Sequence, residues 1–162
     1  MICGLANYAR TLGDGRVAHF GVSFGGNFAA MSGLSGIVDA AVDLGGPVVG
    51  AFEAENVQKL PYGMHDILGN AMHRDHSPTL EELSGALEQL NRHELLAQQR
   101  NSAMLVVNGA DDYFIPQSDT LVFQGRPNTE VHLVEDTGHC AMSKAPEVVP
   151  QIIAWLAAHV AA

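Results

Sequence analysis

The segment Gly21-Val22-Ser23-Phe24-Gly25-Gly26 joins an apolar run, residues 17–22, to residues 27–34, whose apolar side chains have helical spacing. Glycines on both sides of a serine allow the cramped backbone turn that projects a hydroxyl above the end of a sheet. We therefore predict that Ser23 is a nucleophile at a strand-to-helix turn, with the backbone N–H of Phe24 facing the oxyanion that develops during attack. The alternative is a serine in an ordinary glycine-rich turn.

A serine hydroxyl is a weak nucleophile, so it needs a base within hydrogen-bond reach and a carboxylate that orients the base. The sequence offers both, each in a loop that follows an apolar run. Asp112 comes after the predicted strand 103–107, and His139 comes after the predicted strand 130–134. The carboxyl ends of parallel strands are where α/β sheets hold their sites. We predict Asp112 as the orienting acid and His139 as the general base, in chemistry that needs no cofactor and no metal ion.

Three other carboxylates compete for the role of the acid. Asp111 and Asp136 lie in the same two loops as the predicted acid and base, but such residues more often cap turns. Asp43, near the end of the apolar run 37–44, is a weaker rival. We therefore retain Asp112 as the preferred acid.

Four further residues invite functional interpretations of different weight. His19 lies inside a predicted strand and is expected to be a satisfied core histidine. Cys140 adjoins the predicted base, but neighbours in sequence usually point apart, so a small buried thiol is expected. Tyr62 and His65 fall in a helical region and are candidates for substrate contact, with a packing or solvated role as the alternative.

Predicted strands alternate with predicted helices along the chain. This order favours the α/β class, with a parallel sheet and right-handed crossovers, in a domain that spans residues 1–162. From about 49 to 100, prolines punctuate helical stretches, including a predicted helix over 79–99, and we interpret this region as an inserted helical cap. The chain begins with a predicted helix over 2–12. It closes with a helix over 148–160, whose inward residues are expected to be Ile152, Ile153, Leu156 and Val160.

Composition excludes several classes of partner. The formal charge is −10 and only 8 of the 162 residues are Lys or Arg, which argues against nucleic acid. No apolar run approaches the roughly 20 residues that span a bilayer, so no membrane association is expected. The 2 cysteines lie far apart and fit no metal-ligand spacing, and this usage favours a reducing compartment. We expect a cytoplasmic protein.

Two segments resemble loops of a known superfamily. Gly109-Ala110-Asp111-Asp112-Tyr113-Phe114-Ile115-Pro116 and the Gly138-His139 step resemble the acid and histidine loops of α/β hydrolases, and the spacing from Gly109 selects Asp112. The segments 44–48 and 61–66, together with the cap layout, resemble the fermentation/respiration-switch esterase family and its polyketide-shortening and carbon–carbon hydrolase relatives.

This resemblance implies a partial α/β-hydrolase fold that lacks its N-terminal strands. The absent part would supply a strand beside residues 17–22 and a second oxyanion N–H. An unpaired edge invites self-association, so the implied partner is either a second copy or the missing N-terminal half. The predicted function is that of a carboxylesterase acting on a small-molecule ester. The alternatives are a carbon–carbon bond hydrolase acting on a ketone, a non-catalytic binding or regulatory protein, and a non-functional gene fragment.

Overall fold

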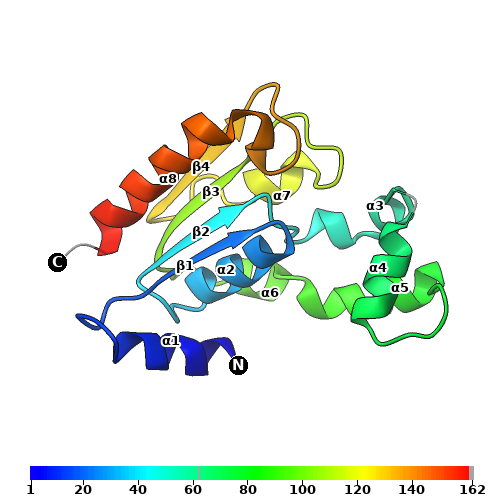
Figure 1. Cartoon of the computed structure of the whole chain (residues 1–162), viewed down its shortest axis with the longest axis horizontal. Coiled ribbons are helices and arrows are strands. Elements are labelled where there is room, and N and C mark those ends of the chain that lie inside the picture. The colour runs from blue at the N-terminus through cyan, green and yellow to red at the C-terminus, as the bar shows by residue number, and fades with distance from the viewer. Residues whose placement is uncertain (62, 161–162) are drawn as a thin grey trace.

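Four parallel strands form one sheet in the computed structural model, which describes residues 1–61 and 63–160. The strands are β1 (Ala18–Val22), β2 (Ala40–Leu44), β3 (Ala103–Gly109) and β4 (Thr129–Val134), and their spatial order follows the sequence. Every neighbouring pair is parallel, which confirms the predicted α/β architecture. β2 is buried along its whole length because strands flank both its edges and helices cover both its faces (Figure 1).

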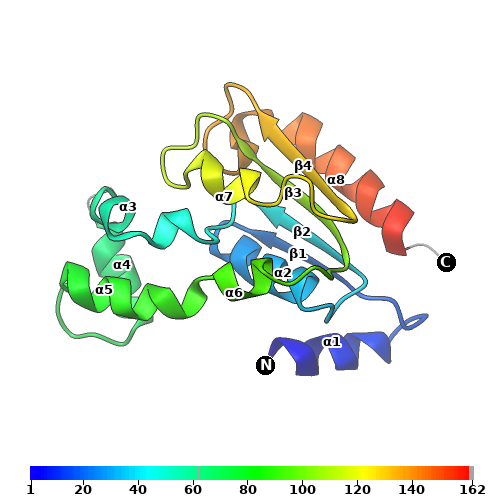
Figure 2. The same ribbon diagram turned by 180° about the vertical axis from the view of Figure 1, so that it is seen from behind.

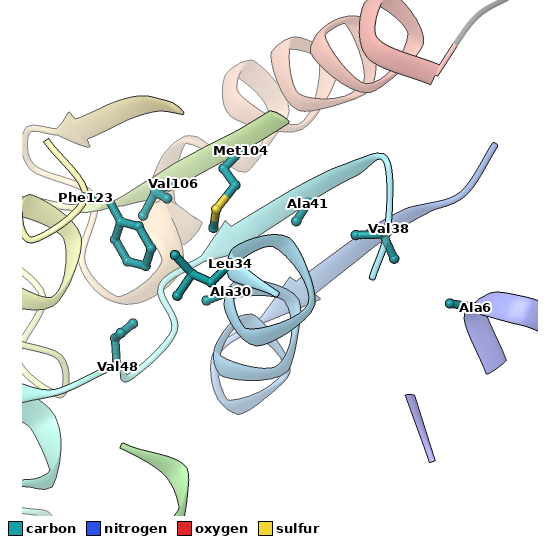
Figure 3. Packing of buried hydrophobic residues seen from close by; sticks show 9 residues of the cluster. All are labelled: Ala6, Ala30, Leu34, Val38, Ala41, Val48, Met104, Val106 and Phe123. Carbon is teal, nitrogen blue, oxygen red and sulfur yellow. The ribbon is translucent and has the colours of Figure 1, made fainter. Parts of the chain in front are cut away.

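Helices pack on both faces of the sheet. α2 (Phe24–Leu34) covers one face and α8 (Ala145–Val160) covers the other, while α7 (Gln117–Leu121) connects β3 to β4 (Figures 1 and 2). Under α2, Leu34, Met104 and Phe123 belong to one buried apolar cluster (Figure 3). Ile152 packs into a second cluster beneath α8. Burial of each large aliphatic side chain stabilises the fold by about 1.5–3 kcal/mol.

Between β2 and β3 the chain leaves the sheet and forms a group of short helices, which we call the helical insert (residues 50–96). Figure 1 shows it extending to one side of the sheet. Its elements are η1 (Gly50–Phe52), α3 (Ala54–Gln58), α4 (Met64–Ala71), α5 (Leu80–Leu87), η2 (Glu88–Leu90) and α6 (His93–Leu96). The insert has its own buried cluster, formed by Phe52, Val57, Leu68, Leu83 and Leu87. A separate core makes the insert a distinct packing unit.

The prediction of one helix over 79–99 is wrong. The helix begins as expected, with a capping box in which Thr79 and Glu82 satisfy each other's backbone N–H groups. It ends at Leu87 and continues only as the short 3-10 helix η2, after which the extended backbone of Asn91, with φ −65° and ψ 131°, stops the helical turns. The next amide, that of Arg92, then donates to the carbonyl of Val48 at 2.9 Å. The hydrogen bond between Arg92 and Val48 thus holds this segment against the body of the protein, although its apolar spacing alone favours a continuous helix.

Buried polar side chains attach both ends of the insert to the body. The amide nitrogen of Asn27, on α2, donates to the carbonyls of Pro47 at 2.7 Å and Leu90 at 2.8 Å. Its oxygen accepts from the buried guanidinium of Arg92, at 3.1 Å from Nε and 2.5 Å from Nη2. On the other side of the same loop, Asp119 accepts four backbone N–H groups from residues 48–51, at 2.6–3.2 Å. The entry and the exit of the insert are thus held by a satisfied polar network.

The two terminal helices bury only part of their apolar side chains. In α1 (Ile2–Arg10), Ala6 is buried, whereas Leu5 is 62% exposed and Leu12, just beyond the helix, is 70% exposed. In α8 Ile152 is buried, but Ile153 is 60% exposed, so the prediction that Ile153 faces inward is wrong. Consecutive helical residues point about 100° apart, so only one of the two can face the sheet. Among the described residues, no helix is long and apolar enough to cross a membrane.

β1 is an edge strand of the described sheet. It pairs with β2 on one side, and no described strand pairs with its other side. Phe20 and Val22 of this strand are 43% and 40% exposed. The expectation of a further strand beside residues 17–22 stays a prediction.

Candidate active site

Ser23 occupies a sharp turn between β1 and α2. Its φ of 55° and ψ of −125° lie in a region that non-glycine residues rarely adopt. Its amide donates to the carbonyl of Leu44 at 2.9 Å, and its own carbonyl accepts from Gly26 at 2.7 Å. The backbone before and after the turn comes so close that a Cβ placed on Gly21 would lie 1.9 Å from the carbonyl oxygen of Gly25. The first glycine of the motif is therefore required by space.

The second glycine of the motif has a different status. A Cβ on Gly25 would have no atom within 4 Å among its described surroundings. A Cβ on Gly26 would lie 2.2 Å from Oδ1 of Asp43 and 2.8 Å from Cα of Gly46. We expected both flanking glycines of the motif to relieve crowding at the turn, and this is wrong for Gly25. The close contact occurs one residue later, where α2 crosses β2.

The side chains of Ser23, His139 and Asp112 form a continuous hydrogen-bonded chain. Nε2 of His139 lies 2.9 Å from Oγ of Ser23, and Nδ1 lies 2.7 Å from Oδ2 of Asp112. Because a carboxylate only accepts, Nδ1 carries a proton, and in the neutral imidazole Nε2 then accepts from the serine hydroxyl. The Asp112 side chain is fully buried and that of His139 is 27% exposed. The structure thus brings together three residues that are separated by up to 116 positions.

The hydrogen bond to Asp112 is the main cause that raises the pKa of His139 to about 9. Burial opposes this effect because it disfavours the charged imidazolium. For Asp112 itself, burial is the largest influence and opposes ionisation. Hydrogen bonds from His139, Asn108 and Phe114 together outweigh it, so that the net pKa of Asp112 is lowered. The pair is therefore set to hold a negative charge beside a positively charged ring.

Asn108, the residue before the Gly109 loop, was missed by the sequence analysis. Its Nδ2 donates to Oδ2 of Asp112 at 2.8 Å, and its Oδ1 accepts from the amide of Cys140 at 3.0 Å. One buried side chain thus fixes both the acid and the turn that carries His139. That turn is strained, because Cys140 and Ala141 have positive φ values of 57° and 51°. A polar residue at the end of an apolar strand was the available signal.

The competing carboxylates have other contacts. Asp111 accepts from the amides of Thr137 and Gly138, both at 2.9 Å, so it links the acid loop to the histidine loop. Asp136 has a positive φ of 56° and lies in the turn after β4. Asp43 is buried beneath α2, where desolvation raises its pKa to about 7. The hydrogen bonds of the described residues join none of the three to His139.

The remaining candidates lie outside this chain of hydrogen bonds. His19 is partly buried, and its Nδ1 lies 2.7 Å from the hydroxyl of Ser32, in line with the expected satisfied histidine. Cys140 is buried, as expected. Among residues 1–61 and 63–160, no three His, Cys, Asp or Glu side chains cluster closely enough to hold a metal ion.

A cavity of about 210 Å³ opens beside Ser23. Ser23 and His139 lie on its wall together with Phe24, the first residue of α2, whose N–H has no acceptor within the helix. The helical insert supplies most of the remaining wall. His65 does not line this cavity, because its Nε2 bonds the carbonyl of Val57 at 3.0 Å within the insert. Tyr62, the other predicted contact, lies outside the described residues.

The sheet, its flanking helices and the turn at Ser23 define the chain as part of an α/β-hydrolase fold. Solved structures that share this fold include the following three. AbyA5 is 18% identical, with a TM-score of 0.75 over 97% of this chain and 49% of its own. The 2,6-dihydroxy-pseudo-oxynicotine hydrolase is 18% identical, with a TM-score of 0.74 over 88% and 39%. MGS-MChE2, an α/β hydrolase from the metagenome of sediments from the lagoon of Mar Chica, Morocco, is 19% identical, with a TM-score of 0.60 over 96% and 69%.

These likenesses establish the fold alone, because the identities are low. The chain spans less than half the length of AbyA5 and of the oxynicotine hydrolase. No family model matches the sequence, and no curated protein matches it.

Proposed function

We propose that the chain carries the active site of a serine hydrolase that cleaves carboxylic esters. The observation that carries this proposal is the hydrogen-bonded chain from Ser23 through His139 to Asp112 at the wall of an apolar cavity. Ordinary surface serines do not combine a strained backbone, an imidazole acceptor and a buried carboxylate behind it.

The geometry supports the following mechanism. Oγ of Ser23 attacks the ester carbonyl while Nε2 of His139 removes its proton. Asp112 stabilises the resulting imidazolium, in agreement with its effect on the pKa of His139. The free N–H of Phe24 and the N-terminal end of α2 stabilise the oxyanion. His139 then returns the proton to the departing alcohol, and water releases the acyl group by the same steps in reverse.

A fluorophosphonate probe tests the nucleophile directly, since it reacts covalently with activated serines. We expect one adduct on Ser23, located by mass spectrometry, and its loss in Ser23→Ala and His139→Ala. Ser35→Ala is the matched control, because Ser35 is exposed at the C-terminal end of the same helix. Folded protein that stays unlabelled, or that is labelled equally in His139→Ala, would contradict the proposal.

A further inference from the structure

The cavity beside Ser23 has an unusually uniform wall. Apart from Ser23 and His139, every described residue of the lining is apolar. The body of the protein contributes Phe24, Phe114 and Ile115, and the loop and helical insert contribute Pro47, Ala51, Phe52, Leu60, Met64 and Leu87. The polar atoms of the wall are thus concentrated at the reacting end.

The far wall is continuous with the core of the insert. Phe52 and Leu87 belong to the buried cluster of the insert, at 5% and 6% exposure, and Leu60 and Met64 pack against that cluster. Side chains fixed by such packing present a preformed hydrocarbon surface rather than a mobile one. A substrate group in this cavity therefore contacts aliphatic and aromatic carbon on the side away from Ser23.

Among the described residues, no charged side chain lines the cavity, apart from the imidazole when it is protonated. Lys59 lies in the wall of a neighbouring cavity. It lines a separate space of about 70 Å³, and Leu60 and Phe114 contribute to both walls. A carboxylate placed against the wall away from Ser23 and His139 would lose its hydration without gaining an ionic partner.

We infer that the group this cavity accepts, on one side of the scissile ester, is an uncharged hydrocarbon group, and that the insert core sets this preference through Met64 and Leu87. The expected effect on hydrolysis rates rests on the proposed esterase function. The inference also predicts that neutral esters bind in the cavity when no hydrolysis takes place. Acids and phosphorylated compounds are excluded as the group that lies against the wall away from Ser23 and His139, because no described residue of that wall can neutralise them.

Matched ester pairs test the inference. The acyl chain of methyl hexanoate ends in a methyl group, whereas that of monomethyl adipate ends in a carboxylate. Hexyl acetate and the acetate ester of ω-hydroxyhexanoate differ likewise on the alcohol side. We expect kcat/KM to favour the neutral member of at least one pair by about 100-fold or more, given the cost of burying an unpaired charge. Equal rates within both pairs would overturn the inference while leaving the esterase proposal intact.

Two arginine substitutions on α4 test whether the cavity wall causes the preference for neutral esters. Met64→Arg introduces a cation into the cavity wall, and we expect it to reduce the discrimination within the affected pair by about 10-fold or more. Ile67→Arg is the matched control, because Ile67 lies one turn further along α4 and is 61% exposed outside the cavity. If both variants change the discrimination equally, the effect comes from overall charge and the assignment to the cavity fails.

Binding to Ser23→Ala separates the two proposals. Saturation-transfer NMR reports contact between each ester and the protein without any chemistry. Preferential contact with the neutral member, reduced by Met64→Arg, would uphold the inference even if the wild-type protein hydrolyses nothing. Equal contact with neutral and anionic members would overturn it, whatever the rates.

Discussion

Asn108 places its side-chain nitrogen 2.8 Å from the carboxylate of Asp112 while its oxygen holds the turn that follows His139. The acid and the base are therefore positioned by a third residue that does not touch the serine. Such supporting contacts determine how closely a hydrogen-bonded chain keeps its geometry when the backbone that carries it is strained.

We expect Asn108→Ala to leave the fold intact and to lower kcat/KM by about 10- to 100-fold, since small displacements of catalytic groups are costly. The free energy of unfolding should fall by about 1–3 kcal/mol, because two buried groups lose their partner. Denaturant titration and ester hydrolysis measure both effects. Asn70→Ala, at an exposed position of α4, is the control, and a loss of stability with unchanged kcat/KM would refute a positioning role.

The pKa of His139 predicts an alkaline pH profile. The base must be neutral to accept the proton of Ser23, and the bond to Asp112 raises its pKa to about 9. We therefore expect kcat/KM to rise with pH and to level off above about 9. In Asp112→Asn the main cause of the shift is removed, so the inflection should move toward about 6.5, the ordinary histidine value. An unchanged inflection would show that another group controls the profile.

The same pKa affects stability. Because the folded protein holds the proton of His139 more tightly than the unfolded chain, this contribution is complete below about pH 6.5 and is lost as the pH rises through about 9. Denaturant titrations of the wild type and Asp112→Asn across this window should diverge at neutral pH and converge at high pH. Parallel curves would contradict the linkage.

The turn at Ser23 predicts unequal effects of two similar substitutions. Gly21→Ala places a methyl group 1.9 Å from a backbone oxygen, so we expect a loss of at least about 3 kcal/mol in the free energy of unfolding, or no folded protein. Gly25→Ala meets nothing within 4 Å and should change stability by less than about 1 kcal/mol. Thermal unfolding compares the two. Equal destabilisation by the two substitutions would show that the close contact at Gly21 is not the reason for its glycine.

The buried carboxyl of Asp43 should give stability a second pH dependence, which arises from desolvation rather than from a hydrogen bond. Its Oδ1 accepts from Gly46, but its Oδ2 has no partner among the described residues, and burial raises its pKa to about 7. The folded protein therefore binds a proton that the unfolded chain releases near pH 4, and stability falls as the pH rises from about 4 to 7. Asp43→Asn should remove this dependence and gain up to about 4 kcal/mol at pH 8 relative to wild type. A stability difference that does not vary with pH would contradict the assignment.

The motifs predicted the three residues that meet in the candidate site, but not the residues that support them. Ser23, Asp112 and His139 belong to local patterns whose chemistry constrains the sequence around them. Asn27 and Arg92 do not, because they are 65 positions apart and their hydrogen bonds form only once the distant segments have packed together. A polar residue in a helical segment gives no indication of which distant chain segment it will meet.

Hydrophobic periodicity was similarly informative in part. It located all four strands and both terminal helices, because the apolar runs of the strands are short and those of the helices recur at helical spacing. It did not predict that Ile153 would be exposed beside the buried Ile152, since a stripe of apolar residues is compatible with more than one orientation. The break at Asn91 also depends on a contact with Val48 that lies outside any local window.

Asn27 holds the carbonyls of Pro47 and Leu90 on one amide nitrogen, so the two points where the helical insert leaves and rejoins the body are neighbours in space. An insert whose two ends lie close together can be lengthened, shortened or exchanged while the strands of the sheet keep their register. The helix that follows Ser23 would remain in place through such exchanges. Changes in the insert can therefore alter most of the cavity wall without displacing the turn at Ser23.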